Sequence, residues 1–223
     1  MINFTKSQPA PPCLEIEKNK ANGDYKCGDV LNRLSADFHN KCYICEEKAP
    51  GSINVEHLVP HQNIQDLKFD WNNLFWACSH CNNTKLAIHN NIINCTDPAV
   101  NVVAGIRLDI KPFPGEKVAV IPMVEDDDSV RNTAALLNAV YNGTTPLKKM
   151  EADGLRNKIL TEIIDFQQLL LHYFDKDGLS EEEKQTLKSQ IRRRLNPQSP
   201  FTAFKYWIIN GNEKLQQEFG DLL

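Results

Sequence analysis

Apolar and polar positions recur with different periods along the chain, and the first third predicts short elements. Residues 1–30 are irregular and rich in proline, so we expect an arm that lies over the surface. Residues 30–38 have apolar positions three and four apart, which predicts a short helix. Residues 53–59 have the character of a strand that ends at Pro60, and residues 82–88 begin with asparagines that favour a helix start.

The middle of the chain alternates in the manner of a β-hairpin. Residues 106–110 alternate cleanly between apolar and polar, and residues 118–121 do so more weakly. The sequence between them contains Pro-Phe-Pro-Gly, which is typical of a turn. Helical spacing begins near Ser129, and we expect this serine to be the N-cap of a helix.

Longer helices are predicted over the last third of the chain. Local signals mark their ends: Thr145-Pro146 at a start, residues 175–178 at an end, Ser180 with Glu183 as a capping box, and Asn196-Pro197 at an end. A last helix is expected through Phe204 and Trp207. The apolar stripes of these helices must be buried, against the rest of the protein or against a partner.

Seven cysteines add chemistry to this pattern. Four of them form two CxxC pairs, whose tight turns can present four sulfur atoms to one tetrahedral zinc ion, and these are Cys42, Cys45, Cys78 and Cys81. Buried free thiols are the alternative interpretation. The other three, Cys13, Cys27 and Cys95, have no partner at a motif spacing, which fits a reducing cytosol better than a disulfide scaffold.

Several polar residues stand between and just after the two CxxC pairs: Glu56, His57, Asn73, Asn82 and Lys85. Their order resembles that of the HNH endonuclease family, whose motif sits on a ββα-metal finger. The resemblance implies that His57 is the general base, that Glu56 and Asn82 bind the catalytic metal, and that Asn73 holds the loop that orients His57. Lys85 is a candidate phosphate contact.

The resemblance covers residues 42–85, and it implies a structural zinc ion and a catalytic Mg²⁺ or Mn²⁺ ion. Phosphodiester hydrolysis needs an activated water and neutralisation of the leaving oxygen, which a histidine and a divalent ion can supply. We therefore expect an α+β fold with a zinc-stapled ββα-metal HNH finger and a mainly helical C-terminal region. Its parts would be an arm at 1–30, the nuclease finger with a flanking helix and hairpin at 31–124, and a helical region at 125–223.

A looser similarity extends over more of the chain. Residues 6–11, 30–45, 132–137 and 199–201 resemble the HNH nuclease subunit of Septu and retron-linked antiphage systems, known as PtuB. That resemblance implies an effector nuclease of an antiviral defence complex that acts with an ATPase subunit (PtuA-like), docked on the helical region.

Charge and hydropathy limit the other possibilities. The net charge is −4 and neither half of the chain is basic, so nucleic-acid contacts should be local. No apolar run approaches the roughly 18 residues of a membrane span, and the first residues do not have the pattern of a signal peptide, so we expect a cytoplasmic protein without membrane contact. DNA is the favoured substrate. An HNH nuclease acting on RNA and a non-catalytic, zinc-stapled nucleic-acid-binding or scaffold module stay open.

Overall fold

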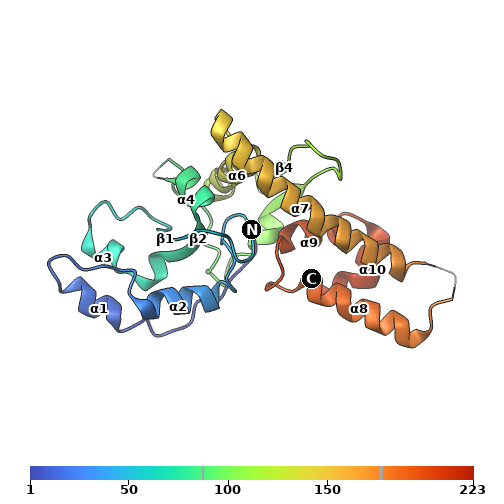
Figure 1. The fold of residues 1–223 in the computed structure, drawn as a ribbon, viewed down its shortest axis with the longest axis horizontal. Coiled ribbons are helices and arrows are strands. Elements are labelled where there is room, and N and C mark those ends of the chain that lie inside the picture. The colour runs from blue at the N-terminus through green and yellow to red at the C-terminus, as the bar shows by residue number, and fades with distance from the viewer. Residues whose placement is uncertain (87, 176–177) are drawn as a thin grey trace.

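The computed structural model describes residues 1–86, 88–175 and 178–223 (Figure 1). Helices predominate, and the described strands form two separate antiparallel pairs, so the predicted α+β class is confirmed. Figure 1 shows the strands β1 and β2 with α1 to α4 on one side and the helices α7 to α10 on the other. Among the described residues, no helix is both long enough and apolar enough to cross a membrane.

The finger consists of two strands followed at once by a helix. Strand β1 (Ile53–His57) pairs antiparallel with β2 (Leu74–Cys78), and all five residues of β2 are buried. Helix α4 (Ser79–Lys85) follows without a loop. It begins three residues before the predicted asparagine start, because the sulfur of Cys78 accepts the backbone N–H of Cys81 at 3.4 Å and caps the helix.

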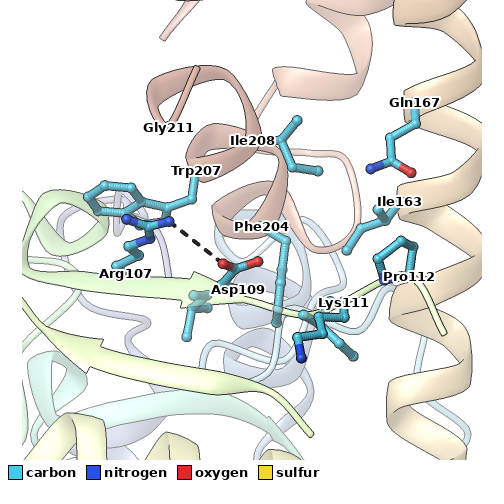
Figure 2. A pocket seen from close by; sticks show the side chains of 12 residues that line it. Arg107, Asp109, Lys111, Pro112, Ile163, Gln167, Phe204, Trp207, Ile208 and Gly211 are labelled. Carbon is cyan, nitrogen blue, oxygen red and sulfur yellow. Dashed lines mark ion pairs between the residues drawn. The ribbon is translucent and has the colours of Figure 1, made fainter. Parts of the chain in front are cut away.

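The hairpin expected from alternation is confirmed. Strand β3 (Ile106–Asp109) pairs antiparallel with β4 (Ala119–Pro122), and the short helix α5 (Val102–Gly105) precedes them. The indole of Trp207 in helix α9 donates to the carbonyl of Ile106 at 2.9 Å. Figure 2 shows Arg107 and Asp109 beside this indole, at a cavity of about 320 Å³ between the hairpin, α7 and α9.

The C-terminal region is helical, as expected, and comprises α6 (Asp128–Asn142), α7 (Pro146–Tyr173), α8 (Glu181–Leu195), α9 (Thr202–Asn210), α10 (Glu213–Phe219) and a final 3₁₀ turn, η2 (Gly220–Leu222). Thr145 caps α7, and Ser180 and Glu183 form the capping box of α8. The predicted N-cap Ser129 is wrong, because the Asp127 carboxylate accepts the first N–H groups of α6. Within the end signal at 175–178, Lys176 and Asp177 lie outside the described residues.

The start of the N-terminal segment is buried. Met1, Ile2 and Phe4 are buried in the main hydrophobic core, since their side chains are apolar and the backbone of Phe4 bonds to Cys95. Two helices follow, α1 (Cys13–Lys18) and α2 (Gly28–Asp37). The first residues are therefore part of the core, while most of residues 7–29 are exposed or partly exposed, and the arm at 1–30 stays a prediction.

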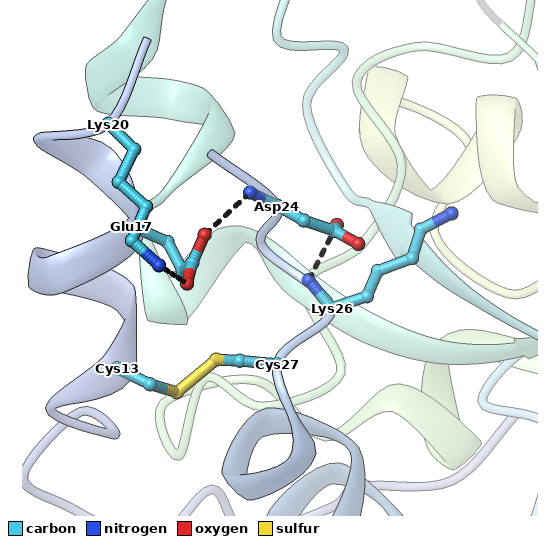
Figure 3. Close-up of a disulfide and its surroundings, with 6 residues drawn as sticks. All are labelled: Cys13, Glu17, Lys20, Asp24, Lys26 and Cys27. Carbon is cyan, nitrogen blue, oxygen red and sulfur yellow. Dashed lines mark hydrogen bonds and ion pairs between the residues drawn. A yellow bond between two sulfur atoms is a disulfide. The ribbon is translucent and has the colours of Figure 1, made fainter. Parts of the chain in front are cut away.

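Cys13 and Cys27 form a disulfide, with their Cα atoms 6.5 Å apart (Figure 3). The prediction that these two cysteines are unpaired is therefore wrong. Their separation of 14 residues matches no motif, and only the turn between α1 and α2 brings them together. The four CxxC cysteines and Cys95 are free and buried.

The core crosses the expected boundaries between the parts of the chain. One hydrophobic cluster joins the N-terminal segment, the finger, the hairpin, α6, and parts of α7 and α9. A second cluster packs the end of α7 against α8, α9 and α10. The division at residues 30 and 124 stays a prediction, and α6, α7 and α9 contribute to the same core as the finger.

Candidate HNH site

The four CxxC cysteines converge on one point. Their sulfur atoms lie within 4.8 Å of one another, and all four residues are buried. Burial raises the pKa of the Cys42 thiol, but hydrogen bonds from the other three cysteines outweigh burial and hold that pKa well below its usual range. Four converging sulfurs suit a tetrahedral zinc ion, so this donor set fits the structural zinc inferred from the sequence.

His57 ends strand β1 and is held in one orientation. Its Nε2 lies 3.0 Å from the carbonyl oxygen of Lys68. Because a carbonyl only accepts, Nε2 carries the proton and Nδ1 keeps a lone pair. Burial lowers the pKa of His57 to about 4, so the imidazole is neutral at pH 7. A neutral imidazole with an available nitrogen is the form that a general base needs.

Asn73 fixes the loop that follows His57. It lies in a 3₁₀ turn, η1 (Trp71–Asn73), directly before β2. Its amide donates to the carbonyls of Val59 and Leu67 at 2.8 and 3.0 Å, and its Oδ1 accepts from the backbone of Val59 at 2.8 Å. Leu67 belongs to helix α3 (Gln65–Lys68), which also supplies the carbonyl that His57 contacts. This network supports the orienting role expected for Asn73.

Glu56 is held from both sides. Lys85 donates to Oε1 at 2.7 Å and the hydroxyl of Tyr43 donates to Oε2 at 2.6 Å. Burial raises the pKa of Glu56, while Lys85 and Tyr43 act to lower it. Each carboxylate oxygen has a second lone pair, so both contacts leave room for a metal ion.

Lys85 does not lie where a phosphate contact would. It is completely buried, and its ammonium group donates to Glu56 and to the carbonyl of His57. In this arrangement Lys85 positions the carboxylate of Glu56 and does not reach the solvent.

Glu56, His57 and Asn82 line one cavity of about 460 Å³, so the structure brings the expected base and metal ligands together. Tyr25 and Lys26, which the sequence interpretation missed, form another part of the wall. They precede Glu56 and His57 by about thirty residues and lie outside the HNH motif, and no spacing signal connects them to it. The disulfide turn carries them there.

Residues 42–87 match the family model described as HNH endonuclease. This part of the chain is similar to an HNH endonuclease domain. The matched range contains both CxxC pairs, β1, β2 and α4, which is the arrangement built up above. No match is found among curated proteins.

The HNH domain is joined to the helices through its second knuckle. His80, between Cys78 and Cys81, contacts Glu151 of α7 at 2.7 Å through Nδ1 and the carbonyl of Val140 in α6 at 2.9 Å through Nε2. The CxxC turn and the helical region therefore share polar contacts as well as a core.

Proposed function

We propose that this chain is a divalent-metal-dependent HNH endonuclease that hydrolyses phosphodiester bonds of nucleic acid, with DNA as the favoured substrate. The observation that carries the proposal is a neutral, oriented His57 in the same cavity as Glu56 and Asn82. A scaffold module would have no need to fix a histidine in this way.

The residues have complementary roles in this mechanism. Nδ1 of His57 takes a proton from the attacking water, while Lys68 and the Asn73 network keep the ring in place. Glu56 and Asn82 would hold Mg²⁺ or Mn²⁺, because a carboxylate and an amide oxygen suit a hard cation that retains several waters. The ion, when bound, neutralises charge on the phosphate and the leaving oxygen. The zinc site is closed by four sulfurs and stays structural.

Plasmid cleavage with Mg²⁺ or Mn²⁺ tests the proposal. His57→Ala should lower the cleavage rate by roughly 10²–10⁴-fold, the usual cost of losing a positioned base. His172→Ala, at an exposed position on α7, is the matched control and should cleave like wild type. Circular dichroism and zinc content should be unchanged in both variants. Equal cleavage by a folded His57→Ala protein would refute the mechanism, and cleavage of RNA alone would select the RNA alternative.

We further propose that the nuclease acts in an antiphage complex with an ATPase subunit that docks on α7. Exposed apolar side chains of this helix support the idea: Met150, Ile164 and Leu171 are 71%, 42% and 73% exposed. They are spaced by 14 and 7 residues, which places them on one face of the helix. The net charge of −4 makes strong DNA binding by the chain alone unfavourable, so a partner would also help to recruit DNA.

Co-expression with a candidate ATPase subunit tests the docking face. Met150→Asp combined with Leu171→Asp should abolish co-elution, because two carboxylates would enter an apolar interface. Gln185→Asp combined with Ser189→Asp adds the same charge on exposed positions of α8 and should leave co-elution intact. Co-elution of the α7 variant with the ATPase would disprove docking on this face.

A further inference from the structure

Lys26 is exposed at the wall of the catalytic cavity and carries a free charge. Of the described residues that line this cavity, it is the one lysine or arginine. Its ammonium group lies 5.4 Å from the ring of Tyr25, and within the described ranges no carboxylate pairs with it. Figure 3 shows the Lys26 side chain extending away from the disulfide and from Glu17. A lysine left unpaired beside a hydrolytic site is available to an anionic substrate.

The segment from Cys13 to Cys27, which carries Lys26, is stabilised by bonds between its own residues. The disulfide closes its two ends, at Cys13 and Cys27. Inside it, Glu17 accepts from Lys20 at 2.5 Å and from the backbone of Asp24 at 3.0 Å (Figure 3). The close packing at Gly23 needs a glycine, since a Cβ there would lie 1.8 Å from the carbonyl oxygen of residue 17.

The same turn is attached to the loop that orients His57. Lys68 donates to the carbonyl of Gly23 at 3.1 Å, and its own carbonyl contacts His57. Tyr25 packs edge-on against His57, with ring centroids 4.6 Å apart. The backbone at Lys26 therefore has a defined position relative to the base.

We propose that Lys26 binds a phosphate of the nucleic-acid substrate next to His57, and that the disulfide-closed turn from Cys13 to Cys27 holds it there. This inference rests on the proposed nuclease function. In this proposal Lys26 makes the phosphate contact that the sequence suggested for Lys85. Lys85 cannot make it, because it is buried and its ammonium group already pairs with Glu56. A compact ammonium on a flexible stem is suited to a phosphate oxygen as a point charge.

The test compares Lys26→Met with Lys26→Arg and with Lys117→Met. The control Lys117→Met removes one positive charge from an exposed position in the hairpin loop. We expect Lys26→Met to lower kcat/KM for plasmid cleavage by roughly 10- to 100-fold, as for loss of a charged hydrogen bond. Lys26→Arg should restore most of that loss, and Lys117→Met should leave it unchanged.

A binding measurement separates this inference from the catalytic proposal. Anisotropy of a labelled DNA duplex of about 20 base pairs, measured without divalent metal over a range of salt, reports phosphate contacts whether or not cleavage occurs. Lys26→Met should reduce the slope of log Kobs against log salt by about one, and Lys117→Met should not. If wild type binds without cleaving, the nuclease proposal fails while this slope still decides the role of Lys26. An unchanged slope, or no binding by wild type, overturns the inference.

Discussion

Three of the described lysines, Lys41, Lys85 and Lys205, are completely buried, and the ammonium group of each pairs with a glutamate. Lys85 contacts Glu56 at 2.7 Å, and Lys205 contacts Glu162 at 2.8 Å. Removing a buried cation from water is costly unless the ion pair and further hydrogen bonds compensate. For Lys205 this compensation is incomplete. Burial lowers the pKa of Lys205 to about 8, although Glu162 acts to raise it.

Lys205 should make stability depend on pH. Its pKa is about 8 in the folded chain and 10.5 for an unperturbed lysine, so between these limits the unfolded chain binds more protons. The free energy of unfolding should therefore rise with pH across this window, by about 3 kcal/mol from this group. In Lys205→Met this increment should be absent, while Glu162 keeps its contacts with Arg194 at 2.9 Å.

Urea unfolding of both proteins from pH 7 to 10.5 would measure the effect. As pH rises, the free energy of unfolding of wild type should increase relative to that of Lys205→Met. Groups common to both proteins cancel in this difference. Parallel pH curves for the two proteins would contradict the expectation.

At the scale of elements, the turn between α1 and α2 is the part whose stability depends most on a single covalent bond. The disulfide joins the start of α1 to the residue before α2, across a separation of 14 residues. In the chain-entropy account, closing a loop of about 15 residues restricts the unfolded chain and stabilises the fold by about 3 kcal/mol.

The free energy of unfolding of the double variant Cys13→Ser, Cys27→Ser should therefore be about 3 kcal/mol lower than that of the oxidised wild type. A phosphine reductant should lower the free energy of unfolding of the wild type to that of the variant, and it should leave the stability of the variant unchanged. A phosphine is the suitable reagent, because dithiols also bind zinc. Equal stability of wild type with and without reductant would show that the bond contributes nothing.

At the scale of the whole molecule, the zinc cluster lies inside the shared core. The hydroxyl of Tyr141 in α6 donates to the carbonyl of Cys45 at 3.4 Å, and His80 contacts both α6 and α7. Tyr141 and the four zinc-site cysteines belong to one hydrophobic cluster. Loss of the zinc site should therefore disturb the helices as well as the finger.

We expect one tightly bound zinc ion per chain, measurable by elemental analysis. Cys45→Ser should lose the ion, and its thermal unfolding should shift to lower temperature as a whole, because zinc binding is on the order of 10 kcal/mol of folding free energy in small fingers. Cys95→Ser changes a buried cysteine outside the cluster and should keep its zinc. Active protein without zinc, or loss of the finger alone with intact helices, would contradict this expectation.

Local sequence signals determined most of the elements and the order of the site. The capping box at Ser180, the proline at the start of α7 and the alternation of β3 all act between residues close in the chain, so they can be read without knowing the fold. The same is true of each CxxC knuckle. Glu56 and His57, which the motif singled out, both line one cavity of the structure.

Only the tertiary structure decided which distant groups became partners. It placed Lys85 on Glu56 and away from solvent, joined Cys13 to Cys27, and brought Lys26 to the wall of the cavity beside His57. These contacts depend on which side chains must find a partner once burial has removed them from water, and on where the turns direct the backbone. Neither the partners of buried side chains nor the direction of the turns can be inferred from the spacing of residues along the chain. The sequence pattern could therefore predict the elements and the motif. The buried ion pairs, and the part of the cavity wall formed by Tyr25 and Lys26, could be identified only from the tertiary structure.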